Sequence, residues 1–134
     1  MIAVLDANAA VELVVKRPLA APIRDVISGA DSVLAPDLYV SEVTNTFWKY
    51  LRSRLLPEET VCAALDGAIA LIDRYEPAGA LYREALAFAH RHNHPVYDAL
   101  YAILARRNAA LLVSVDTRLC EIAEREGIRT LQYT

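Results

Sequence analysis

The chain has 134 residues, of which 55% are hydrophobic, and a formal net charge of −3 at pH 7. This composition excludes a disordered or low-complexity protein, and we expect a single domain over residues 1–134 that folds on its own core. No apolar stretch reaches the roughly 20 residues of a membrane span, and no basic segment leads into an apolar signal region. With two isolated cysteines, these features predict a cytoplasmic protein with reduced thiols and no membrane contact.

The first half of the chain is predicted to form a strand, two helices, a second strand and a helical hairpin. The apolar run Ile2-Ala3-Val4-Leu5 is typical of a buried strand, and it stops at Asp6. We expect helices over residues 7–15 and 20–27, a strand over 32–35, a long helix from Pro36 to Leu55, and a second helix from Glu58 to about Asp73.

The second half of the chain continues the alternation of strands and helices. We expect a short strand over residues 74–77, helices over 80–91 and 96–107, a strand over 111–115, a helix over 117–126 that ends at Gly127, and a last strand over 129–132. Strands that alternate with helices predict an α/β fold with a mainly parallel sheet and helices on both of its faces.

Two aspartates follow the most strand-like runs of the chain. Asp6 ends the first run and Asp116 ends the run that begins at Leu111, and the carboxyl ends of parallel strands form the edge where ligands bind. Each aspartate also precedes a helix, so the alternative is that each is only an N-cap. Carboxylates that meet without a cationic partner either trap protons or hold a divalent cation, and the second case predicts a metal-dependent enzyme.

Two further acids lie in predicted helices. Glu42 shares one side of the long helix with Asn45, Lys49 and Arg52, a periodicity that favours a solvated face but also allows a polar stripe over the sheet edge. Asp98 lies in the first turn of a helix that is apolar nearly all round, where the helix dipole offsets only part of the cost of burying a charge. A bound cation would compensate Asp98, unless it is neutral or reaches solvent.

The basic residues and the histidines give weaker signals. Lys49, Arg52 and Arg54 form a local group that is either solvated or a phosphate-binding patch. His90, His92 and His94 alternate, so a helix would not direct all three at one ion, and we interpret them as a helix C-terminus favoured by the dipole.

Four segments together resemble the PIN-domain family, and more narrowly the VapC-type toxins of prokaryotic toxin–antitoxin pairs. These segments are Val4-Leu5-Asp6-Ala7-Asn8, Ser41-Glu42-Val43-Thr44-Asn45, Val96-Tyr97-Asp98-Ala99-Leu100-Tyr101-Ala102 and Val113-Ser114-Val115-Asp116-Thr117-Arg118-Leu119. The resemblance spans the whole chain. Asn8 departs from the Ser or Thr that is more frequent in the family, and Ser114 stands where Thr is frequent.

The resemblance implies a three-layer α/β/α sandwich and a ribonuclease that depends on Mg²⁺ or Mn²⁺. It implies that Asp6, Glu42, Asp98 and Asp116 are the catalytic, metal-binding acids, and that the polar groups that tune them are Asn8, Asn45, Ser114 and Thr117. It also implies an RNA substrate, a homodimer and a cognate antitoxin of the VapB type. The local basic group Lys49, Arg52 and Arg54 is our candidate for contacting the phosphates of that RNA.

Three alternatives remain from the sequence. A haloacid-dehalogenase-like phosphatase would need a second aspartate two residues after Asp6, where this chain has Asn8. A receiver domain would need a lysine late in the chain, and none follows Lys49. A catalytically silent PIN-like module that binds only RNA or protein fits the same motifs.

Overall fold

A four-stranded parallel sheet forms the centre of the molecule. The computed structural model describes residues 1–133, and the order of the strands in the sheet is β3-β2-β1-β4. The two central strands are β1 (Ile2–Leu5) and β2 (Ser32–Pro36), and the outer strands are β3 (Arg74–Glu76) and β4 (Leu111–Val113). Both central strands are apolar almost throughout because helices cover both of their faces.

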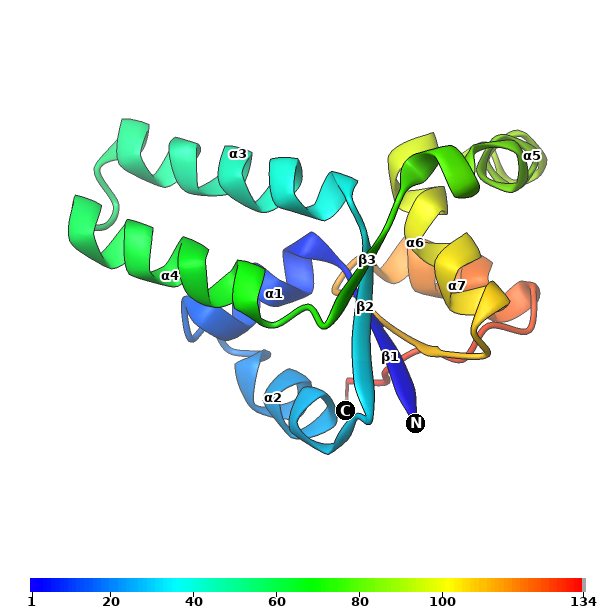
Figure 1. Ribbon diagram of the computed structural model, residues 1–134, viewed down its shortest axis with the longest axis horizontal. Helices are drawn as coiled ribbons and strands as arrows, with labels where there is room; N and C mark the ends of the chain where they lie inside the picture. The colour runs from blue at the N-terminus through cyan, green and yellow to red at the C-terminus, as the bar shows by residue number, and fades with distance from the viewer. Residues whose placement is uncertain (134) are drawn as a thin grey trace.

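Helices form a layer on each face of this sheet, as Figure 1 shows with the sheet seen from its edge. One layer contains α1 (Ala7–Val14), α2 (Ala20–Gly29), α3 (Leu38–Ser53) and α4 (Glu58–Ala70). The other contains α5 (Tyr82–His92), α6 (Val96–Arg107) and α7 (Thr117–Arg125), and a short 3₁₀ turn, η1 (Ala78–Ala80), precedes α5. The predicted three-layer α/β/α sandwich is therefore confirmed.

The helices differ in how deeply they are buried. Helix α6 packs on three strands and on α5 and α7, and all seven residues from Ala99 to Ala105 are buried, as its apolar sequence predicts. The α3–α4 hairpin instead extends away from the sheet (Figure 1). Val43 and Phe47 of α3 are buried, but Val40 in its first turn and Leu51 toward its far end are exposed.

The predicted strand over residues 129–132 is wrong. Only one parallel bridge forms there, between Leu112 and Thr130, because the segment turns away from β4 after a single pair of backbone hydrogen bonds. The side chain of Gln132 donates to Glu124, and the hydroxyl of Tyr133 donates to the carbonyl of Ser114 at 3.0 Å. These contacts fix the segment against α7 rather than along the sheet.

The turn after α7 follows the prediction. Gly127 has a φ of +78° just past the end of the helix, a left-handed conformation that glycine adopts without strain, and Ile128 N–H bonds to the carbonyl of Ala123 at 3.0 Å. Within residues 1–133, no helix is both long and apolar enough to cross a membrane.

Candidate active site

The carboxyl edge of the sheet brings the two strand-terminal aspartates together. Strands β1 and β4 are parallel neighbours, so Asp6 and the loop after Val113 lie side by side, and Asp6 N–H bonds to the carbonyl of Val113 at 2.9 Å. The side chain of Asp6 is buried, with only 4% of the residue exposed. A carboxylate this deeply buried requires either a proton or a compensating charge.

The loop between β4 and α7 holds Asp6 through hydroxyl and amide groups. Ser114 Oγ donates to Asp6 Oδ2 at 2.8 Å and accepts from Asp116 N–H at 3.1 Å. Asn8 Oδ1 accepts from Val115 N–H at 3.1 Å. Ser114 thus contacts Asp6 directly, and Asn8 contacts the loop that leads to Asp116.

The helical layers on the two faces supply the other two acids. Glu42 lies on α3, and its Oε1 accepts a hydrogen bond of 2.6 Å from the hydroxyl of Tyr101 on α6. Asp98 lies in the first turn of α6, and an oxygen of its carboxylate is within 4.8 Å of one of Asp116. Four carboxylates from distant segments therefore form one group, which we call the acidic site (Asp6, Glu42, Asp98 and Asp116).

The electrostatics show that these carboxylates are crowded. Burial raises the pKa of Asp6 from 3.8 to about 7, and the nearby charges of Glu42 and Asp98 add to this effect, although the hydrogen bond from Ser114 opposes it. Burial also raises the pKa of Glu42, opposed by the hydrogen bond from Tyr101 and reinforced by the charge of Asp98. Burial raises the pKa of Asp98 as well, opposed by His94 and reinforced by the charge of Asp116. Each of these three carboxylates therefore keeps its proton to a higher pH than it would in water, as expected where burial and like charges act together.

Among the described residues, neither lysine nor arginine side chains relieve this crowding, and only at Asp98 does an imidazole, that of His94, partly oppose it. Among residues 1–133, none of the four acids forms an ion pair with a lysine or an arginine, although arginines pair with acids elsewhere. Partial relief comes from the N-termini of α1 and α7, which begin beside Asp6 and Asp116. Each helix N-terminus carries about half a positive charge, so the two together offset about one of the four carboxylates, and the acidic site remains negative when it is ionised.

Comparison with known proteins identifies the fold family of this site. The family model of the PIN domain matches residues 3–125. The chain belongs to the PIN domain family. This confirms the resemblance drawn from the sequence.

Individual relatives agree with this assignment. The chain is 29% identical over 120 residues to Ribonuclease VapC3 of Pyrobaculum aerophilum, an alignment that covers 88% of this chain and 92% of the relative. The fold resembles the crystal structure of PAE2754 from Pyrobaculum aerophilum, with a TM-score of 0.70, 22% identity, and coverage of 98% of this chain and 92% of that one. It also resembles FitAcB from Neisseria gonorrhoeae, with a TM-score of 0.65, 18% identity, and coverage of 98% and 97%.

The capping alternative holds for one aspartate of this PIN domain and fails for the other. Asp116 Oδ1 accepts from Leu119 N–H at 3.1 Å, so it caps α7. Asp6 is at the same position before α1 but makes no side-chain cap. Capping therefore does not explain why a buried carboxylate is present at residue 6.

Two residues of the site were missed or misread in the sequence. The imidazole of His94 is only 6% exposed, and its Nε2 lies 2.9 Å from Asp98 Oδ2, so its interpretation as part of a helix C-terminus is wrong. Helix α5 ends at His92, and His94 lies in the link that turns back to Asp98. Tyr101 was missed as the partner of Glu42; its place one turn after Asp98 on the same helix was the available signal.

The remaining predicted residues lie around the site without contacting the acids. Asn45 and Thr117 are exposed, and no hydrogen bond within residues 1–133 joins either side chain to the acidic site. Lys49, Arg52 and Arg54 are exposed on the outer part of α3, and Lys49 is about 10 Å along the helix axis from Glu42. Their predicted roles remain proposals.

The acidic site fits a hard divalent cation. Its donors are carboxylate oxygens, which Mg²⁺ and Mn²⁺ accept, and Asp98 is 28% exposed, which leaves a path from solvent. Burial and mutual repulsion raise the pKa of Asp6 and Asp98, and a dication can replace the protons that otherwise relieve this cost. The residues present are therefore suited to a metal.

Proposed function

We propose that this PIN domain is a metal-dependent endoribonuclease and the toxin of a type II toxin–antitoxin pair. The observation that carries the proposal is the acidic site itself: four carboxylates that converge at the carboxyl edge of the sheet with no lysine or arginine partner among residues 1–133. The similarity to a relative named Ribonuclease VapC3 supports the same reaction class.

Asp6, Asp98 and Asp116 would hold Mg²⁺ or Mn²⁺, with Glu42 binding a second ion or orienting the attacking water. Such an ion supplies a water that is nucleophilic at neutral pH and positive charge for the phosphodiester in the transition state. Ser114 fixes the orientation of the Asp6 carboxylate, and Tyr101 fixes that of Glu42. These hydrogen bonds keep the oxygens in place before substrate arrives, which lowers the reorganisation needed during the reaction.

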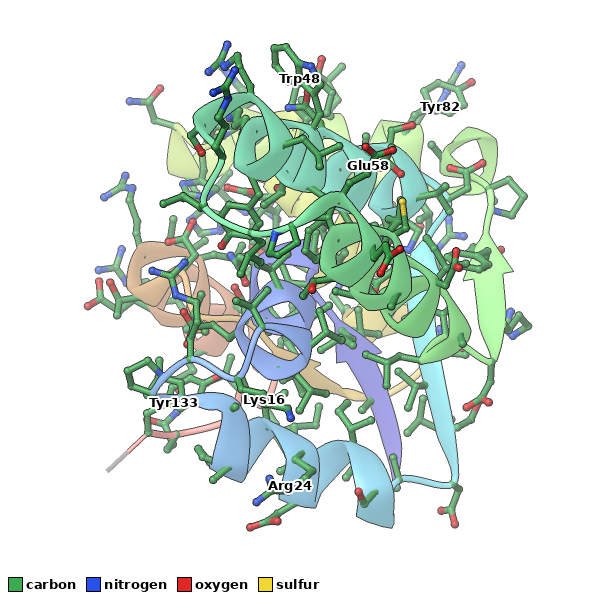
Figure 2. The ribbon with its side chains drawn as sticks, turned by 90° about the vertical axis from the view of Figure 1, so that its left-hand side faces the viewer. Lys16, Arg24, Trp48, Glu58, Tyr82 and Tyr133 are labelled. Atoms are coloured by element: carbon green, nitrogen blue, oxygen red, sulfur yellow. The ribbon has the colours of Figure 1, made fainter. Side chains whose placement is uncertain are left out.

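The substrate and partners follow from the surface around the site. Lys49, Arg52 and Arg54 would contact phosphates of an RNA that extends along α3. Trp48 is 51% exposed, and Figure 2 shows it projecting from α3 at the surface of the hairpin. Exposed apolar area of this kind favours a protein interface, and we assign it to a homodimer or to a VapB-type antitoxin. The cytoplasm would be the site of action.

A test of this function compares RNA cleavage by the wild-type protein and by Asp98→Asn. We expect Mg²⁺- or Mn²⁺-dependent cleavage of structured RNA that stops when a chelator is added and falls by at least about 100-fold in Asp98→Asn. Glu84→Gln is the matched control, because Glu84 is an acid paired with two arginines outside the acidic site, and this variant should cleave as the wild type does.

The competing function is a silent PIN-like module that binds RNA or a protein without cleaving it. Retained RNA or antitoxin binding with no metal-dependent cleavage by the wild-type protein would favour that module and contradict the proposal. Cleavage that survives both the chelator and Asp98→Asn would place the reaction outside the acidic site.

A further inference from the structure

His94 is buried against the acidic site although no role there was assigned to it. A ring nitrogen of His94, an oxygen of Asp98 and an oxygen of Asp116 all lie within 4.8 Å of one another. The ring is 6% exposed, so its nitrogen faces the carboxylates rather than solvent. It is a nitrogen donor in a group whose other donors are carboxylate oxygens.

The backbone holds His94 in this position from both sides. Asn93 ends α5 in the left-handed conformation, with φ of 50°, and His94 N–H bonds to the carbonyl of Ala89 at 3.1 Å. Pro95, whose φ is restricted by its ring, follows His94 as the N-cap of α6. A three-residue link, residues 93–95, that is fixed at both ends leaves the imidazole little freedom to swing away from Asp98.

The geometry suits ligands of one ion. With metal–ligand distances of about 2.1 Å, neighbouring ligands of an octahedral ion are about 3.0 Å apart and opposite ligands about 4.2 Å apart. The 2.9 Å between His94 Nε2 and Asp98 Oδ2 matches a neighbouring pair. The longest separation in the group is at most 4.8 Å, so a side-chain movement of less than about 1 Å would bring all three to one ion.

We infer that His94 is a nitrogen ligand of the metal bound by Asp98 and Asp116, and that it makes the site prefer Mn²⁺ and later transition dications over Mg²⁺. Magnesium is bound almost entirely by oxygen, whereas imidazole nitrogen binds transition dications well, so one nitrogen donor shifts the balance between them. This inference rests on the proposed metal-dependent function and specifies which metal serves it.

Metal titrations of the metal-free protein test the inference without relying on activity. Affinities for Mn²⁺ and Mg²⁺ are measured by calorimetry, and the melting temperature is followed with each ion alone. We expect Mn²⁺ to bind the wild type at least about tenfold more tightly than Mg²⁺, and His94→Gln to weaken Mn²⁺ binding by about 10- to 100-fold while changing Mg²⁺ binding by less than about threefold.

A matched control and a direct measurement separate ligation from positioning. His92→Gln makes the same change in a histidine whose Nε2 is 2.8 Å from Glu126, outside the acidic site, and should bind both ions as the wild type does. Glutamine at residue 94 can still donate a hydrogen bond to Asp98. If His94 only positions Asp98, His94→Gln should therefore keep the preference for Mn²⁺ over Mg²⁺. Pulsed electron paramagnetic resonance of the Mn²⁺-loaded wild type should show coupling to a ¹⁴N nucleus that His94→Gln removes.

The outcomes distinguish this inference from the proposed function. Metal binding with no nitrogen coupling, or a Mn²⁺ preference unchanged in His94→Gln, would overturn the role of His94 and leave the metal-dependent nuclease standing. No binding of either ion by the wild type would overturn both. The resonance experiment on the wild type needs no variant, so the inference stays testable if His94→Gln is unstable.

Discussion

Two clusters of carboxylates in this protein have opposite electrostatic surroundings. In the acidic site the four acids face one another, and burial and mutual repulsion raise the pKa of Asp6, Glu42 and Asp98. On the outer side of α5, α6 and α7, acids and arginines instead alternate in an ion-pair network, which consists of Glu84, Arg91, Arg106, Arg107 and Glu126.

The ion-pair network lowers the pKa of its acids, whereas the acidic site raises the pKa of its own. Hydrogen bonds from Arg107 and Arg106 hold the pKa of Glu84 below its usual range. Burial alone would raise the pKa of Glu126, but hydrogen bonds from His92 and Arg91 outweigh it and hold the pKa low. Acids that are paired with arginines stabilise the fold, whereas acids that are crowded together at a sheet edge lower its stability. Carboxylates with raised pKa values of this kind are typical of functional sites.

The largest effect on stability is expected at Asp6, whose pKa is about 7 instead of 3.8. The folded state binds this proton more tightly than the unfolded chain does. The stability that the bound proton adds is therefore fully present below about pH 4 and is lost as the pH rises to about 7. Asp6→Asn has no proton to lose, and its Oδ1 can still accept from Ser114. We expect the metal-free variant to exceed the wild type at about pH 8 by up to about 4 kcal/mol in free energy of unfolding.

Urea unfolding with a chelator at about pH 5 and about pH 8 measures this difference. Metal ions should stabilise the wild type through preferential binding to the folded state, and this response should shrink in Asp6→Asn. A variant that is less stable at both pH values and keeps the full metal response would instead make Asp6 a structural residue.

An intermediate effect is expected from Tyr101→Phe. The variant removes the hydroxyl that donates to Glu42 Oε1 at 2.6 Å and leaves the ring, which is buried, in place. A hydrogen bond to a charged group contributes about 1.5–3 kcal/mol, and without it the pKa of Glu42 rises further. We expect cleavage to fall by about tenfold near neutral pH and the acidic limb of its pH profile to move to higher pH.

Steady-state cleavage rates across the pH range check this prediction. Tyr97→Phe is a suitable control, because Tyr97 lies on the same helix but is 64% exposed and makes no side-chain hydrogen bond within residues 1–133. An unshifted pH profile in Tyr101→Phe would show that the hydroxyl does not set the ionisation of Glu42.

The smallest effect is expected from Glu84→Gln in the ion-pair network. Its partners Arg106 and Arg107 are about as exposed as Glu84 itself, so the loss should be below about 1 kcal/mol and should diminish at high salt. Because the pKa of Glu84 is lowered on folding, its contribution is present at neutral pH and disappears as the pH falls below the usual range of a glutamate. Urea denaturation of this variant and of the wild type at low and high salt measures the loss in free energy of unfolding. A loss that does not depend on salt would contradict the prediction.

Local rules in the sequence predicted that two of the four acids, Asp6 and Asp116, lie at one edge of the sheet. Asp6 and Asp116 stand where strand-like runs stop, and the parallel arrangement of β1 and β4 places such residues together. The prediction that Glu42 and Asp98 lie beside these two aspartates came from the family resemblance, because helical periodicity alone favoured a solvated face for Glu42. The position of His94 was predicted wrongly because the orientation of its side chain depends on how α5 ends and α6 begins. The spacing of residues along a helix does not predict the orientation of a residue between two helices.

The amino-acid sequence by itself determined the order and type of nearly all elements and a parallel sheet with helices on both faces, because hydrophobic periodicity and turn residues act over a few neighbouring positions. The family came from the resemblance of four sequence segments. Tertiary structure alone decided which carboxylates remain without a cation, that Tyr101 holds Glu42, that His94 faces Asp98, and that residues 129–132 leave the sheet after one bridge. Those outcomes depend on side chains that are far apart in the chain, and their pairing is set only when the helical layers pack on the two faces of the sheet.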